Sequence, residues 1–413
     1  MTFHPRERQV PRRLFIRWGA YGVAAAGLSP AVLAACGGGD EGAGSSEGVK
    51  LSRPDDPATL PTFDDVEAIA DGLSPETGTL RVYNYEEYIA PEVVAAFEQE
   101  FGVSVEITTF TSMDEAVAKL ASGEVAFDVF FPTPDVVGKL AAGKLLQPLN
   151  KTYLGNLENV WESLRDPFYD QGSVFTVPYT LYTTGIGYRI DAVAKTPEDY
   201  DNPYDIFWDP ANAGQVYVLE DDREVFAMAL LRADPDVDVN TEDADLIAGA
   251  LADVSELTEL VKVKVGSQAY TVLPEKRTWV HQAWSGDAIN AQYYLPEGET
   301  IDNIGYWANP QGVIGSDTIA VLRSATKPVL AHAFLNFLLD TDRALENYGW
   351  LGYQPPQLSL QPDQVVADEY VPAHLATAVI RAEDFEAGQQ LLQLTLEGER
   401  IWDDAWSTFT AGG

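Results

Sequence analysis

Acidic and aromatic side chains recur where the sequence predicts the ends of strands. Carboxylates beside aromatic rings suit the capture of an organic ammonium ion, because a ring face attracts a cation by about 0.5–2 kcal/mol. A carboxylate must accompany the rings, since an ammonium group buried without a counter-charge is costly. The acids are Glu87, Asp221, Glu224, Asp287 and Asp317, and the rings are Tyr85, Tyr88, Trp284 and Tyr353.

No motif for covalent chemistry accompanies these residues. The sequence contains neither the H-E-x-x-H spacing of a metalloprotease nor a phosphate-binding P-loop. Its four histidines are widely scattered, and its single cysteine, Cys36, excludes an intrachain disulfide. We therefore expect a binding site without a metal or cofactor. A secreted hydrolase that uses paired carboxylates, such as a glycosidase, is the remote alternative.

The charge of the chain favours cationic partners. The sequence has 64 acidic against 26 basic residues, for a formal net charge of −38. Such a field disfavours nucleic acid as a partner and attracts cations. The alternative is that the excess acid serves only solubility, for example in a salty habitat.

The length and composition of the chain bound its domain organisation. The 413 residues suggest about two domains, and 46 % apolar residues are enough for large cores.

The first 35 residues have the features of an export signal. Arginines precede an apolar run that is too short for an ordinary membrane span, and Arg12-Arg13 resembles a twin-arginine motif. Cys36 ends a stretch that resembles a lipoprotein processing box, so we expect removal of residues 1–35 and acylation of Cys36. The alternative is a stray buried thiol. Residues 36–78, rich in Gly, Ser, Pro and acids, are predicted to form a flexible tether.

The first predicted strand and helix indicate the fold class. Polar and apolar residues alternate over 80–84, and a helical apolar pattern follows Pro91 and ends at Gly102. Further predicted strands, such as 127–131 and 216–219, alternate with helices. This order favours an α/β fold with a mainly parallel sheet.

Each group of acids and rings has a plainer interpretation. Ligands of open α/β sheets bind at the carboxyl ends of strands, where residues 85–88 follow the first strand. That stretch could equally be a solvent-exposed acidic loop. Asp221 and Glu224 could serve simply to cap a helix, because the helix dipole favours a carboxylate at the helix start by roughly 0.3–1 kcal/mol. The aromatic residues of 394–409 are interpreted as core packing and not as a binding face.

Several stretches resemble the periplasmic polyamine-binding proteins of ABC importers, the spermidine/putrescine-binding family. The resemblance extends from about Thr79 to Gly413. Residues 221–226, DDREVF, are the most specific match, and residues 284–287 match as WSGD. Other similar stretches are 80–91, 127–133, 177–187 and 350–355.

The resemblance implies a set of ligand contacts. The aromatic rings would line the methylene chain of the ligand, and the acids would neutralise its ammonium groups. Thr133 falls at a position where the family has a hydroxyl group. In full, the ligand-binding residues expected from the resemblance are Tyr85, Tyr88, Thr133, Asp135, Asp221, Glu224, Trp284, Asp287, Asp317 and Tyr353.

Three positions depart from the family's pattern. Asp135 stands where many members have an aromatic residue, Gly315 stands where a second stacking ring is usual, and Tyr182 replaces a small residue. Fewer stacking rings and an additional acid leave open which organic cation binds. The late glutamine of the family corresponds to Gln389, Gln390 or Gln393.

The fold implied by the resemblance is an α/β, two-lobed periplasmic-binding-protein fold of a type II-like kind, with the ligand cleft between the lobes. The first lobe would contain residues 79–185 and 316–356. The second lobe would contain residues 186–315 and 357–413.

The function implied is that of a monomeric extracytoplasmic lipoprotein, anchored at Cys36, that binds spermidine or putrescine and presents it to a membrane ABC permease. It would have neither enzymatic activity nor a nucleic-acid partner. The alternative within the same fold is another organic cation, such as an opine or a quaternary amine, or a metal chelate.

Overall fold

The computed structural model describes residues 51–110 and 112–412. The predicted signal peptide, residues 1–35, and the predicted lipidation site, Cys36, lie outside the described residues. Among the residues that are described, no helix is both long enough and apolar enough to cross a membrane.

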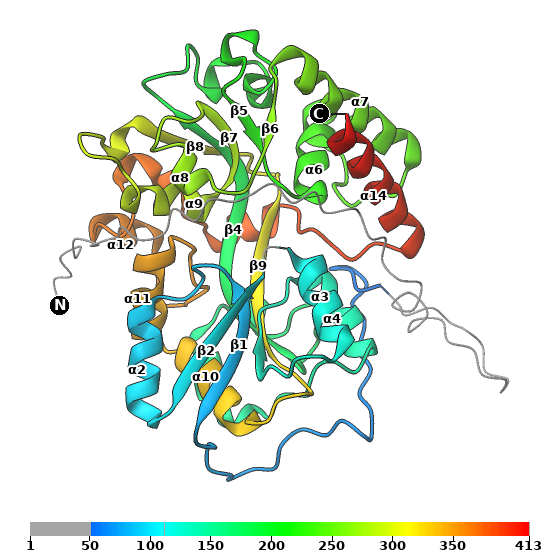
Figure 1. The fold of residues 1–413 in the computed structure, drawn as a ribbon, viewed down its shortest axis with the longest axis vertical. Coiled ribbons are helices and arrows are strands. Elements are labelled where there is room, and N and C mark those ends of the chain that lie inside the picture. Colours follow the sequence, from blue (N-terminus) through cyan, green and yellow to red (C-terminus); the bar gives the residue numbers. More distant parts are fainter. Residues whose placement is uncertain (1–50, 111, 413) are drawn as a thin grey trace, which may run out of the picture.

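One long strand joins two halves of the molecule. β4 (Thr176–Arg189) pairs with β9 (Ile314–Val321) through its first half, and with β7 (Val280–Trp284) and β8 (Ile304–Ala308) through its second half. The change of partner falls after Thr183. In Figure 1, β4 and β9 run between two lobes, each with its own helices. The chain therefore has the two-lobed α/β architecture that we expected.

The nine-stranded sheet is mixed, whereas the sequence predicts a mainly parallel one. β4 is antiparallel to all three of its partners, and only the outer strands of each lobe pair in parallel. The strand order is β2-β1-β3-β9-β4-β7-β5-β6, with β8 beside β4. The prediction is wrong because strands that cross between lobes have no helical crossover to make them parallel.

The first lobe begins with the predicted strand and helix. Its strands are β1 (Thr79–Tyr85), β2 (Ser104–Phe110) and β3 (Val129–Phe130), and its helices are α2 (Pro91–Phe101), α3 (Met113–Ser122), α4 (Pro134–Ala142), α5 (Glu162–Arg165), α10 (Pro328–Leu338) and α11 (Thr341–Leu351). Pro91 opens α2, and Gly102 ends it with a left-handed φ of 63°. Ser112 caps α3 by accepting the backbone N–H of Glu115 at 3.3 Å.

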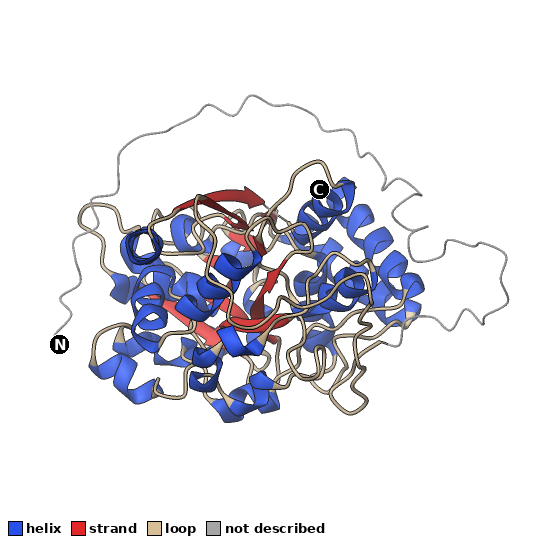
Figure 2. Cartoon of the chain, turned by 90° about the horizontal axis from the view of Figure 1, so that it is seen from below, coloured by secondary structure: helices blue, strands red, loops and turns tan. Residues whose placement is uncertain are grey.

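Apolar clusters cover both faces of this part of the sheet. Alternate residues of a strand point to opposite faces, so Leu80 packs with Phe97 of α2 and Phe334 of α10 on one face. Tyr83 packs on the other face, where its ring stacks on Phe127 with 4.5 Å between the centroids. The strands lie between layers of helices in Figure 2. Burial of both faces fixes the carboxyl ends of these strands, which carry Tyr85 and Tyr88.

The second lobe has a core of its own. The remaining elements of the chain are β5 (Val216–Val218), β6 (Lys264–Val265), α6 (Asp222–Ala233), α7 (Ala244–Leu260), α8 (Ala269–Val272), α9 (Ser285–Asn290), α12 (Pro362–Ala367), α13 (Ala382–Ala387) and α14 (Leu396–Ala411). Trp402 of α14 is fully buried, with its ring centroid 6.0 Å from that of Phe226 in α6. The predicted core role of the aromatic residues near the C-terminus is confirmed.

Short 3-10 turns connect these elements. They span Lys151–Tyr153, Gly155–Asn159, Pro197–Asp199, Pro203–Ile206, Pro210–Asn212, Ala291–Tyr293, Ile301–Asn303 and Ala373–Ala378.

Part of the predicted flexible tether packs on the first lobe. Residues 51–78 run along that lobe in Figure 1, and Leu60 is buried among its apolar residues. Asp65 forms a salt bridge with Lys144 at 2.7 Å. The Glu76 carboxylate accepts backbone N–H groups at the start of α10, at 2.8 and 3.3 Å. These contacts were not predicted, because the apolar residues of the segment are too sparse to show a periodic pattern.

The limits of the lobes stay a prediction. Ile380 and Phe385, which the sequence analysis assigns to the second lobe, pack in the apolar cluster of the first. The side-chain amide of Gln354 donates to the Ile380 carbonyl at 2.8 Å and accepts the Ile380 backbone N–H at 2.9 Å.

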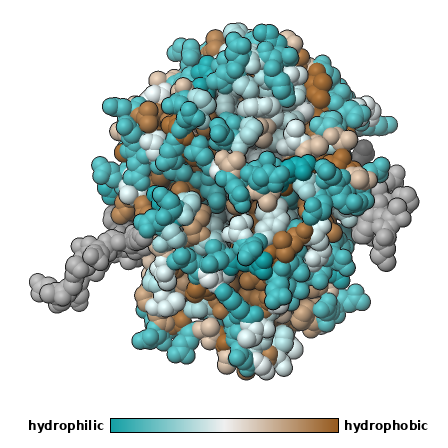
Figure 3. All heavy atoms as spheres, turned by 180° about the vertical axis from the view of Figure 1, so that it is seen from behind, coloured by the Kyte–Doolittle hydropathy of each residue, from teal (hydrophilic) through white to brown (hydrophobic). Residues whose placement is uncertain are grey.

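The face in Figure 3 is mostly hydrophilic, with apolar residues scattered over it, in keeping with the acidic composition.

Candidate ligand-binding cleft

Glu224 is a buried carboxylate at the start of α6. Asp221 caps that helix by accepting the Glu224 backbone N–H at 3.0 Å, so helix capping accounts for one of the two acids. The Glu224 side chain does not cap the helix but points toward Thr184 and Trp284. Its Oε1 accepts the Thr184 hydroxyl at 2.9 Å and the Trp284 indole N–H at 3.0 Å. Its Oε2 is buried without a hydrogen-bond partner among the described residues.

Asp287 repeats this arrangement in α9. Its Oδ1 accepts the Tyr353 hydroxyl at 2.8 Å, and its Oδ2 is buried with no hydrogen-bond partner in the described part of the chain. The Tyr353 ring lies against Gly286, where a Cβ atom would be 2.4 Å from the ring. Glycine is therefore required beside Asp287 for the tyrosine to reach the carboxylate.

Asp317 lies on β9, next to the rings of the first lobe. It accepts the Tyr88 hydroxyl at 2.5 Å, and that hydroxyl also bonds to Thr180 at 2.8 Å. The Tyr88 ring contacts Tyr85 and Tyr353 edge to face, with centroids 5.5 and 5.3 Å apart. A continuous aromatic wall therefore connects Asp317 with Asp287.

Four of the acids, namely Asp135, Asp221, Glu224 and Asp317, lie close enough for the charge of one to affect another. Burial, followed by the charge of Asp221, raises the pKa of Glu224 to about 8. Burial raises the pKa of Asp287 to about 7 and that of Asp317 to about 6. Burial also raises the pKa of Asp221, and the charge of Asp135 adds to the effect at both Asp221 and Asp317. The protonated form of these carboxyl groups is therefore favoured first by burial and only second by the neighbouring acids.

No basic side chain of the described chain pairs directly with these acids, although the charge of Arg223 partly offsets the rise in the pKa of Asp221 and Glu224. None of Asp135, Asp221, Glu224, Asp287 and Asp317 forms a salt bridge within the described residues. Arg223, their neighbour in sequence, points its guanidinium toward Asn240 and lies over the Trp402 ring. The arrangement can therefore accept a cation from outside the chain.

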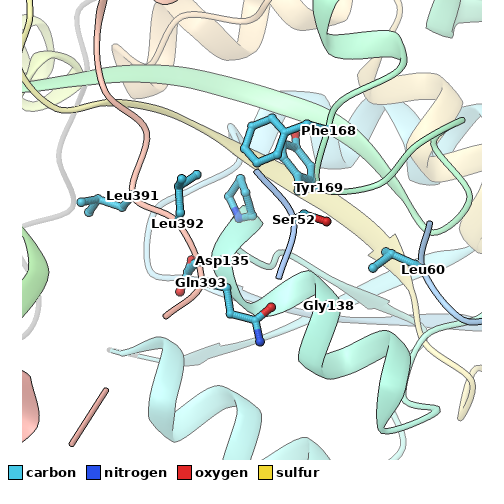
Figure 4. Close-up of a pocket in the computed structure, with 10 residues that line it drawn as sticks. Ser52, Leu60, Asp135, Gly138, Phe168, Tyr169, Leu391, Leu392 and Gln393 are labelled. Atoms are coloured by element: carbon cyan, nitrogen blue, oxygen red, sulfur yellow. The ribbon is translucent and has the colours of Figure 1, made fainter. Parts of the chain in front are cut away.

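A small hollow opens beside Asp135 (Figure 4). Phe168 and Tyr169 line it from the first lobe, and residues 391–393 line it near α14. Phe168 and Tyr169 were not predicted from the sequence, because they lie in a loop that shows neither a helical nor a strand-like pattern. Of the candidates for the late glutamine, Gln393 lines this hollow, whereas Gln389 bonds to the backbone of Val237 and Val239. Which of them corresponds to the family's glutamine stays a prediction.

Two of the singled-out residues form no hydrogen bond with the paired acids in the described chain. Thr133 precedes α4, and its side chain makes no capping hydrogen bond there. Glu87 is exposed and accepts the Tyr294 hydroxyl at 2.7 Å. The other predicted acids and rings come together as expected. Whether they touch a ligand stays a prediction.

The described residues contain no group of three or more His, Cys, Asp or Glu side chains arranged to hold a metal ion.

Two α/β lobes with buried acids and rings between them are typical of a solute-binding protein. Comparisons with known proteins indicate the same class. The family model described as bacterial extracellular solute-binding protein matches residues 92–373. The spermidine/putrescine-binding periplasmic protein of Escherichia coli strain K12 is 28 % identical over 297 residues, covering 71 % of this chain and 82 % of that protein. The putrescine-binding periplasmic protein PotF of the same strain is 30 % identical over 286 residues, covering 65 % and 75 %.

A solved structure has the same fold. The spermidine/putrescine ABC transporter substrate-binding protein PotD from Streptococcus pneumoniae matches with a TM-score of 0.66 at 22 % identity, covering 81 % of this chain and 99 % of that one. The chain belongs to the family of bacterial extracellular solute-binding proteins. It is a binding protein and not an enzyme, which removes the hydrolase alternative.

The raised pKa values predict how stability depends on pH. In the folded, ligand-free protein Glu224 and Asp287 hold protons that the unfolded chain has already lost above pH 6.5. Folding stability therefore falls as the pH rises through the folded pKa values. We expect the melting temperature of the ligand-free protein to fall between pH 6.5 and 8.5, measured by circular dichroism.

Glu224→Gln should flatten this fall, because it removes the acid with the highest of the pKa values given above. Glu256→Gln is the control, since it makes the same charge change at an exposed position of α7. A melting temperature that is constant or rises over this range in the wild type would contradict the assignment.

Proposed function

We propose that this protein binds a polyamine, such as spermidine or putrescine, in the cleft between its lobes. The observation that supports this function is a group of buried carboxylates with free oxygen atoms and no positive partner in the described chain. Aromatic rings adjoin each of these acids, which suits ammonium groups joined by methylene segments. The names of the two Escherichia coli relatives agree with this ligand class.

In this proposal, the free oxygens accept hydrogen bonds from ammonium groups of the ligand. Glu224 Oε2 and Asp287 Oδ2 have no other donor among the described residues. Asp317, Asp221 and Asp135 add negative charge around them. The rings of Tyr85, Tyr88, Trp284 and Tyr353 line the methylene chain, and Thr133 provides a hydroxyl.

The lobes would close on the ligand by a hinge motion. Two contacts between the lobes support a closed arrangement of this kind. Tyr294 donates to Glu87 on one side, and Lys139 of α4 forms a salt bridge with Glu399 of α14 on the other. The hinge would lie where β4 changes partner, so that residues 79–185 and 316–356 move against 186–315 and 357–413.

The closed protein would present its cargo to a membrane ABC permease. We further propose that it works as a monomer held at the outer face of the cell membrane by a lipid on Cys36. Residues 37–50 would then separate the lipid from the segment 51–78 that packs on the first lobe. Family membership supports the extracellular location, and the processing box in the sequence supports the anchor.

The binding site predicts specific losses. Glu224→Gln preserves an acceptor for Thr184 and Trp284 but removes the charge, so we expect putrescine and spermidine to bind at least tenfold more weakly, about 1.4 kcal/mol. Trp284→Ala should have a similar effect because it removes a ring and a donor to Glu224. Isothermal titration calorimetry measures both affinities.

Glu256→Gln is again the matched control, and its affinity should equal that of the wild type. Unchanged affinity in both cleft variants would refute the site. A thermal-shift panel with polyamines, quaternary amines, opines and metal chelates separates the polyamine from the alternatives. If the wild type responds only to a compound that is not a polyamine, the proposed ligand is wrong.

The anchor predicts a defined mature N-terminus. In a bacterial host that exports and lipidates the chain, mass spectrometry should find an acylated Cys36 as the first residue. Cys36→Ala should move the protein from the membrane fraction to the soluble extracytoplasmic fraction, because no acyl chain is attached. A wild-type protein that is soluble, with an unmodified Cys36, would contradict the anchor.

A further inference from the structure

Tyr182 and Gly315 are paired across two strands. In the sequence, both residues depart from the pattern of the polyamine-binding family, and nothing there connects them. In the structure, Tyr182 on β4 lies directly opposite Gly315 on β9. A Cβ atom at Gly315 would lie 2.5 Å from Cζ of Tyr182 and 2.6 Å from its hydroxyl oxygen. The end of the tyrosine ring therefore occupies the space that a side chain at residue 315 would need.

The Tyr182 ring lies among the acids of the cleft. It packs edge to face on Trp284, with 6.5 Å between the centroids and 75° between the planes. Burial keeps its pKa well above the usual value, and the charges of Glu224, Asp317, Asp221 and Asp135 add to this effect, in that order. The hydroxyl therefore stays neutral at physiological pH and is able to donate.

These acids come from both sides of the cleft. Glu224 is at the start of α6 in the second lobe, whereas Asp317 is on β9 and Asp135 is in α4. A ring that is close to all of them lies between the two groups of negative charge. The ring is therefore placed where it could contact a ligand that bridges the groups.

We propose that Tyr182 is a further ligand-contacting residue, which favours linear cations with a charge at each end over compact cations. This inference rests on the proposed function. The ring supplies a flat face for the methylene segment between the charged ends. It also fills the space above Gly315, so that a broad quaternary head has less room.

A purely structural role would be the alternative, in which the ring only fills space between the strands. Leucine tests this alternative, because it fills part of the same volume with apolar atoms but has no ring face. Phenylalanine preserves the face and lacks the hydroxyl. Gly315→Ala leaves Tyr182 in the sequence but forces its ring to move.

The experiment measures putrescine and choline affinities by calorimetry for each purified full-length variant. Tyr182→Leu should weaken putrescine binding at least fivefold and lower the ratio of putrescine to choline affinity. Tyr182→Phe should cause a smaller loss than Tyr182→Leu, and Gly315→Ala should reduce putrescine affinity like Tyr182→Leu. Tyr217→Leu is the matched control, since that ring stacks on His281 in β7, and its affinity should not change.

Exchanging the two residues provides a second test. Tyr182→Gly removes the ring, and adding Gly315→Tyr returns a ring to the same space from the opposite strand. The double variant should bind putrescine at least threefold more tightly than Tyr182→Gly alone. Recovery of this kind is expected for a ligand contact and not for general packing.

The outcomes separate this inference from the proposed function. If the wild type binds no polyamine or other organic cation, the proposed function fails and this inference fails with it. If the wild type binds putrescine and a folded Tyr182→Leu binds it equally well with the same selectivity, only this inference is overturned. If Tyr182→Leu does not fold, Gly315→Ala decides, because unchanged putrescine affinity in that variant overturns the inference.

Discussion

Buried carboxylates without a salt-bridge partner are the constraint on which this structure depends. Glu224 and Asp287 are 2 % and 3 % exposed, and neither forms a salt bridge within the described residues. Burying a carboxylate without a counter-ion is costly, and neutral donors such as Trp284 and Tyr353 offset only part of that cost. The pKa values rise as a consequence. In the proposed function, a cation bound beside these acids would remove this penalty, so that binding and closure of the lobes would favour each other.

The acids come from elements that are far apart in the sequence. Asp317 is on β9 in the first part of the sheet, Glu224 starts α6, and Asp287 lies in α9 of the second lobe. Each acid is held by a hydroxyl or indole from another element, which fixes one oxygen and leaves part of the carboxylate for a ligand. β4 contributes Thr184, whose hydroxyl donates to Glu224, and Thr180, which bonds to the Tyr88 hydroxyl that donates to Asp317. The strand that connects the lobes therefore supports one acid directly and another through Tyr88.

Much of this arrangement was predictable from local patterns. The strand and helix of residues 79–102 were found from alternation, proline and glycine, and the motif at 221–226 marked an acid that does more than cap its helix. The sequence did not show that Tyr182 lies over Gly315, because cross-strand register depends on the tertiary structure. Nor did it show that residues 51–78 pack on the first lobe, since their contacts are single residues such as Leu60 and Glu76. Gln393 could be distinguished from Gln389 only by the hydrogen bonds of the latter to the backbone of Val237 and Val239.

The most direct test of the charge argument is the number of protons released when putrescine binds. If the cleft acids are partly protonated without ligand, a cation must displace those protons into the buffer at pH 7.5. Calorimetric titrations in phosphate and in Tris should then differ, with the more exothermic heat in Tris, whose protonation releases more heat. Equal heats in the two buffers, with putrescine bound in both, would show that no proton leaves. That result would contradict the claim that the cleft holds uncompensated, partly protonated carboxylates.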